Sequence, residues 1–120
     1  MGWGLILSQL THLEMYNGHM ELTWDIYEIQ SSADTLHGVM LRGRVRKFTI
    51  ENDIVCLVEN ASDTENVVRF ALLANTDPVK VTDFIQQLIP GSMVSKVLES
   101  VENPVLSKLK VNDLSRYLLE

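Results

Sequence analysis

Apolar and polar residues alternate along much of the chain, which is the pattern of β-strands with one buried face. The segment Leu10 to Trp24 alternates around Asn17-Gly18, a pair that favours the type I′ turn of a two-residue hairpin. Three later runs have the length and composition of strands: Val39 to Phe48, Ile54 to Val58 and Val67 to Leu73. The pattern therefore predicts an N-terminal hairpin followed by three strands.

One segment has helical periodicity instead. Asp77-Pro78 is typical of a helix start, because Asp caps free amides and Pro is preorganised for the first helical position. Apolar residues then follow at helical spacing before Pro90-Gly91 ends the segment. We expect a helix from Asp77 to Ile89 that buries Phe84, Ile85 and Leu88.

Three strands, a helix and a final strand pair are the order of an OB-fold, a five-stranded Greek-key barrel with its helix between strands three and four. The final pair is Met93 to Val101, which also fits a helix, and Val105 to Val111. The competing architecture, a split βαβ sandwich, needs two helices where the pattern shows one. We expect one structural unit, in which residues 1–35 form an extension with the hairpin and residues 36–120 form the OB-fold domain.

The charge distribution restricts the partners of the chain. With 120 residues it has the size of one domain, and its net charge of −6 opposes non-specific binding to nucleic acid. A nucleic-acid site therefore requires a local basic patch, and the sequence offers one. Arg42, Arg44 and Arg46 lie on the outer face of the predicted strand, and Lys47 follows them in the chain. The alternative is a solvated strand face whose cations pair with carboxylates.

The amino-acid sequences of the predicted elements resemble those of a known family. The relevant runs are Val39-Met-Leu-Arg-Gly-Arg-Val45, Ile54-Val-Cys-Leu-Val58, Val67-Val-Arg-Phe-Ala71 and Val81-Thr-Asp-Phe-Ile-Gln-Gln-Leu-Ile-Pro-Gly-Ser-Met-Val94. They are similar to the N-terminal anticodon-binding OB domain of class IIb tRNA synthetases, and most of all to its aspartyl branch. The resemblance implies an RNA-binding barrel for the tRNA anticodon loop, without the catalytic domain and without a cofactor.

The resemblance also implies a binding surface, with departures from the family pattern. Cys56 stands where the family has an aromatic residue that stacks on a base, and Arg69 stands where a base-reading Gln is usual. Asn60 replaces an arginine at the end of the second strand, and Phe48 and Phe70 are alternative aromatic faces. Together with the basic patch, these residues predict RNA binding with poor discrimination among anticodon loops.

A hairpin face that carries two histidines and two glutamates, His12, Glu14, His19 and Glu21, is a weak candidate metal site, and mutual screening on a solvated face explains it better. The sequence contains no nucleophile beside a base, no glycine-rich phosphate loop and no HExxH pair. We therefore expect no enzymatic activity from the chain itself.

The apolar runs are far shorter than the about 20 residues that span a bilayer, and no basic leader opens the chain, so we expect a cytoplasmic protein with no membrane partner. Cys56 lies in an apolar run and is expected to be a buried, unreactive thiol. The alternative function is a protein-interaction barrel that has lost RNA binding, with a second copy or another protein as partner.

Overall fold

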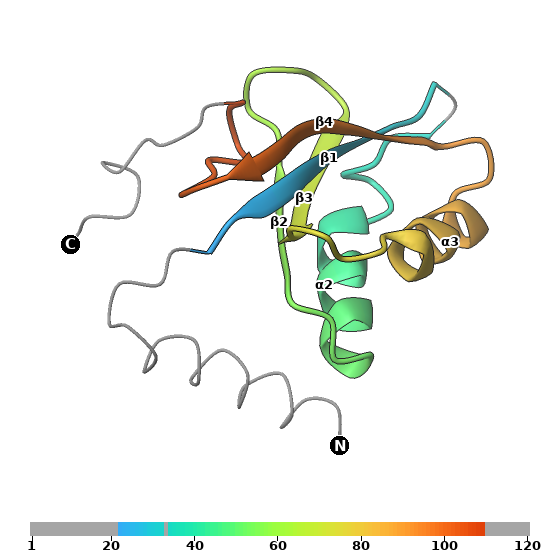
Figure 1. Ribbon diagram of the computed structural model, residues 1–120. Helices are drawn as coiled ribbons and strands as arrows, with labels where there is room; N and C mark the ends of the chain where they lie inside the picture. The colour runs from blue at the N-terminus through green and yellow to red at the C-terminus, as the bar shows by residue number, and fades with distance from the viewer. Residues whose placement is uncertain (1–21, 33, 110–120) are drawn as a thin grey trace.

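The computed structural model in Figure 1 describes residues 22–32 and 34–109. The predicted hairpin around Asn17-Gly18 lies outside these residues. The described elements follow one another as β1 (Trp24–Gln30), α2 (Leu41–Glu51), β2 (Cys56–Asn60), β3 (Val67–Leu73), α3 (Val79–Leu88) and β4 (Met93–Val101).

The four strands form one open antiparallel sheet in the order β2-β3-β1-β4, and both helices cover the same face of it (Figure 1). This element order is that of a split βαβ, or ferredoxin-like, sandwich. The described residues do not form the closed five-stranded OB barrel that the sequence predicted. The largest difference is a segment that was expected to be a strand and is instead one of the two helices. The strand before it and the segment after β4 also differ from the prediction.

The segment expected to be a strand is Val39 to Phe48, most of which belongs to helix α2. Leu41 and Val45 are four residues apart, a spacing that places them on one face of a helix as well as on one face of a strand. Both are fully buried, and Thr49 continues the buried face one turn later. Arg and Lys are good helix formers, and Gly43 lies on the exposed side, where an added Cβ would meet nothing.

Strand β1 lies in the centre of the sheet, and this position explains why its hydrophobic pattern does not alternate. Ile26 and Tyr27 are neighbours in sequence and both are buried, because Tyr27 faces the helices and Ile26 faces the other side of the sheet. A strand covered on both faces needs apolar residues at successive positions. Residues 24–30, which the sequence assigned to an extension, are thus part of the sheet itself.

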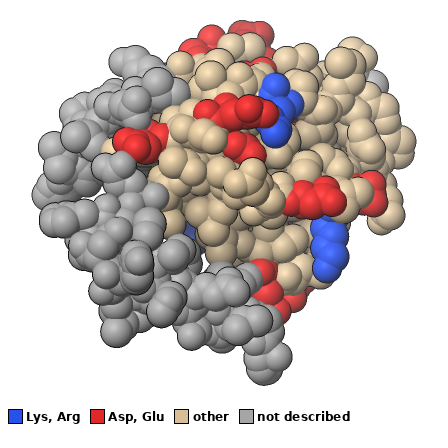
Figure 2. Space-filling view, viewed as in Figure 1, with Lys and Arg blue, Asp and Glu red and all other residues tan. Residues whose placement is uncertain are grey.

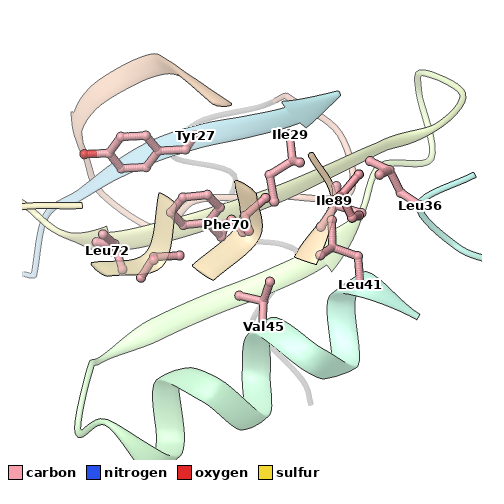
Figure 3. Packing of buried hydrophobic residues seen from close by; sticks show 11 residues of the cluster. Tyr27, Ile29, Leu36, Leu41, Val45, Phe70, Leu72 and Ile89 are labelled. Carbon is pink, nitrogen blue, oxygen red and sulfur yellow. The ribbon is translucent and has the colours of Figure 1, made fainter. Parts of the chain in front are cut away.

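The main core lies between the sheet and the two helices (Figure 3). Tyr27 and Phe70 stack there with ring centroids 4.9 Å apart, and α2 contributes Leu41 and Val45 to the same cluster.

The helix predicted after Asp77-Pro78 is confirmed as α3, which packs on the same core. The Asp77 carboxylate accepts the Val79 N–H at 3.0 Å. Ile85 is fully buried, whereas Phe84 and Leu88, which were also expected to be buried, are only partly so.

A smaller core covers the opposite face of the sheet. Ile26 and Ala71 pack there against Leu106, which belongs to the segment 102–109 that follows β4. We call this segment the strap. A final strand was expected from Val105 to Val111, but the described part of that range, residues 105–109, contains a single bridge residue and turns. The strap therefore covers the part of the helix-free face around Ile26 and Ala71.

Candidate functional site

Helix α2 brings together the four cations that the sequence singled out. Arg42, Arg44, Arg46 and Lys47 are all exposed, since the buried face of the helix is occupied by apolar residues one turn apart. At 3.6 residues per turn, Arg42 and Arg46 lie on one flank of the helix, and Arg44 and Lys47 lie on the other. Among the described residues, no carboxylate forms an ion pair with any of the four.

The basic helix (Arg42, Arg44, Arg46 and Lys47) belongs to a chain that is acidic as a whole. Glu51 is the single carboxylate within the helix, and the whole chain has a net charge of −6. Figure 2 shows acidic side chains dispersed over one face of the molecule with few Lys or Arg among them. The cations of α2 are therefore a local positive patch on a negative protein, which is the arrangement that a specific anion site requires here.

Three further residues that were predicted to contact RNA, Phe48, Cys56 and Asn60, do not form a platform on which bases could stack. Phe48 is partly buried and its ring stacks on Phe84 with centroids 4.2 Å apart. Cys56 packs against the main core, and burial raises the pKa of its thiol to about 12, so the thiol stays protonated at neutral pH. Asn60 ends β2, and its buried Oδ1 has no hydrogen-bond partner among the described residues.

Arg69 is separated from the other predicted site residues. It lies on the helix-free face of β3, with only 2% of its surface exposed. Its Nε donates to Glu28 at 2.8 Å, and its Nη1 contacts Asp63 at 2.9 Å and donates to the Leu106 carbonyl at 3.1 Å. The guanidinium thus fastens the strap to the sheet and does not reach the solvent, where a base or a phosphate would meet it.

A hollow of about 650 Å³ lies between the β1–α2 loop and the β2–β3 turn. Asn66 joins the two, because its amide accepts the Leu36 N–H and donates to the carbonyls of Ser31 and Asp34. Asp63 and Glu65 give the lining a negative charge, which disfavours a phosphate. Within the described residues, no three His, Cys, Asp or Glu side chains are grouped as metal ligands.

The weak metal candidate of His12, Glu14, His19 and Glu21 falls outside the described residues. No helix in residues 22–32 and 34–109 is both long and apolar enough to cross a bilayer.

Sequence reasoning missed the free edge of β2, which is described below. An edge is created by the pairing of strands far apart in the chain, and no local pattern in Cys56–Asn60 marks it.

Comparison with known protein families, curated proteins and solved structures gives no match to this chain. The functional argument therefore depends on the geometry of the chain itself.

Proposed function

We propose that this chain is a small nucleic-acid-binding module whose helix α2 binds the phosphate backbone of single-stranded RNA. One observation carries the proposal. Four exposed cations lie on a single helix of 11 residues, without an ion-pair partner among the described carboxylates, in a chain of net charge −6. A cluster of like charges without partners costs free energy unless an anion binds it, and a phosphate backbone is such an anion.

The spacing of the cations supports this assignment. Arg42 and Arg46 are one turn apart, about 6 Å along the helix axis, so that each can contact a different phosphate. Arg44 and Lys47 extend the patch over the other flank. Guanidinium groups bind phosphate through two parallel hydrogen bonds, which favours arginine in such a role.

The helix-free face of the sheet favours contacts to the RNA backbone rather than to the RNA bases. RNA-recognition domains with a four-stranded sheet stack bases on aromatic side chains of that sheet. Here Tyr27 and Phe70 both face the helices, and the helix-free face lies under the strap beside Arg69. The described residues thus offer no sheet platform for stacking, which supports weak discrimination among RNA sequences, anticodon loops included.

Salt dependence provides the test, measured by fluorescence anisotropy with labelled single-stranded RNA. Each phosphate contact to a single strand contributes about −0.7 to the slope of log affinity against log salt. Four contacts predict a slope near −3, or about a 50-fold loss of affinity between 50 and 200 mM salt. An aspartate anticodon stem-loop and the same stem with a scrambled loop are expected to bind within a few-fold of each other.

Two double variants with the same change in net charge separate the patch from the rest of the surface. Arg44→Gln with Lys47→Gln is expected to reduce the slope by about 1.4. Lys80→Gln with Lys108→Gln removes two exposed cations that lie on α3 and the strap and is expected to leave the slope nearly unchanged. No RNA binding at 50 mM salt, or equal losses in the two variants, contradicts the proposal.

A further inference from the structure

A groove runs along the outer edge of β2, the strand at one end of the sheet. It has a volume of about 250 Å³. The strand supplies one wall with Cys56, Leu57, Val58 and Glu59, while Arg46 of α2 and Leu106 of the strap complete the lining. The groove thus lies between a basic helix on one side of the sheet and an apolar residue on the other.

The hydrogen-bond pattern shows which backbone groups of β2 face this groove. The Ala61 N–H donates to the Val67 carbonyl at 2.9 Å, so that this pair is a hydrogen-bonded pair of the ladder. Bonded and non-bonded pairs alternate in an antiparallel ladder. Leu57 and Glu59 therefore turn their N–H and C=O groups towards β3, whereas Cys56, Val58 and Asn60 turn theirs outward.

No described residue pairs with those outward backbone groups. A row of unpaired N–H and C=O groups is a template for another strand.

We propose that the free edge of β2 binds an extended peptide of a partner protein as an added strand, with acidic side chains towards α2 and apolar side chains towards the strap. Successive side chains of an added strand point to opposite faces of the sheet. Those on the helix side come close to Arg46, and to Arg42 on the same flank of α2. Those on the other side meet Leu106 and Leu57, whose surface is 38% exposed.

Charge also decides against a second copy of the chain as the occupant. Helix α2 packs against β2, so two copies joined by their β2 strands about a two-fold axis would bring their α2 helices together. Arg42 and Arg46 of each copy would then approach those of the other, and like charges in such a position repel. An acidic peptide relieves the same charges, which is why we assign the edge to it.

The opposite edge of the sheet is less suited to strand addition. Strand β4 has register shifts where it pairs with β1 between Trp24 and Tyr27, and Ser100 has a positive φ of 52°. Irregular edges of this kind prevent pairing with a further strand. The site is therefore specific to β2.

The test uses the full chain and two labelled heptapeptides, Thr-Val-Glu-Val-Glu-Val-Thr and its counterpart with lysine at both glutamate positions. Val58→Pro removes an outward N–H and leaves the bonds to β3 in place, because proline is tolerated where the N–H of an edge strand is free. Val94→Pro is the matched control on β4. Its N–H also faces outward, since Met93 and Ser95 pair with the β1 residues that turn towards β4, and both valines are half-buried against the same core.

The glutamate peptide is expected to bind the wild-type chain at least about ten-fold more tightly than the lysine peptide, since it alone complements Arg46. Val58→Pro should weaken it by about ten-fold or more, because the variant cannot form the central ladder bond, while Val94→Pro changes it less than two-fold. Arg46→Glu leaves the strand intact and should reverse the preference between the peptides, which keeps the test decisive if Val58→Pro fails to fold.

Several outcomes overturn the proposal. They are no binding of either peptide, equal binding by Val58→Pro and wild type, or an unchanged peptide preference in Arg46→Glu. A concentration-dependent dimer in light scattering that Val58→Pro abolishes assigns the edge to a second copy instead. RNA affinity is measured on the same variants, and Val58→Pro is expected to leave it unchanged, so that failure of the RNA proposal and failure of the peptide site are told apart.

Discussion

Arg69 differs from the arginines of α2 in every respect that determines its chemistry. It is buried, it contacts two carboxylates and one carbonyl, and it lies on the other face of the sheet. The resemblance to an anticodon-binding barrel led to the prediction that Arg69 contacts a base. No local signal corrects this, because Glu28 lies opposite Arg69 through the pairing of β1 with β3, 41 residues apart.

Removing this cation is expected to destabilise the fold strongly. Arg69→Met leaves Glu28, whose side chain is 14% exposed, without its partner, and breaking a buried pair costs about 3–5 kcal/mol. The exposed Arg44→Met should change the free energy of unfolding by no more than about 0.5 kcal/mol. Urea denaturation measures both. Adding Glu28→Leu to Arg69→Met should recover part of the loss, and equal stability of the two single variants contradicts the assignment.

At the level of elements, α3 and β3 were predictable because their patterns are unambiguous. Val67–Leu73 is the predicted strand without change of bounds, and the helix after Asp77-Pro78 begins at its capping signal. Helix α2 was not predictable in this way. Leu41 and Val45 satisfy periods of both two and 3.6 residues, whereas Phe48, seven residues after Leu41, fits only the helical period.

The packing of α3 predicts unequal costs for two adjacent core substitutions. Ile85 is fully buried, so Ile85→Ala should cost about 2–5 kcal/mol, as in other closed cores. Phe84 is only partly buried and rests on Phe48 at the edge of the helix pair, so Phe84→Ala should cost less than the about 3 kcal/mol that is the minimum for a fully buried ring. Chemical denaturation of the two variants checks the order, and a larger loss in Phe84→Ala contradicts this description of the core.

At the scale of the whole molecule, the strap is held to the sheet by polar contacts of the β2–β3 turn. Ser62 N donates to the Ser107 carbonyl at 2.6 Å, and Asp63 accepts the Leu109 N–H at 3.0 Å while it also pairs with Arg69. These contacts join positions more than 40 residues apart, so no local pattern in the sequence predicts them. The packing of the strap on the helix-free face thus depends on contacts between residues far apart in the sequence.

The same contacts make the fold sensitive to acid. The N–H of Leu109 and the guanidinium of Arg69 hold the pKa of Asp63 below its usual range. A depressed pKa in the folded state stabilises the fold above the pKa of the unfolded chain, about 3.9, and this contribution is lost as the pH falls through the folded-state value.

We therefore expect Asp63→Asn to be less stable than wild type at pH 7, with a smaller difference at pH 3. Urea denaturation at the two pH values measures it. Asp83→Asn, which removes an exposed carboxylate of α3, should show little difference at either pH. A gap for Asp63→Asn that does not shrink at pH 3 contradicts the role of the strap contacts.

Because β1 lies in the centre of the sheet, it completes its pairing only late in synthesis. The strand is complete at Gln30, but one of its two neighbours, β4, ends only at Val101. Ribosomes add about 5–20 residues per second, so about 4–14 seconds separate the synthesis of β1 from that of its last partner. During this interval a strand with apolar residues on both faces has an unpaired edge. Newly made chains are therefore most exposed to aggregation and to chaperone binding before β4 has left the ribosome.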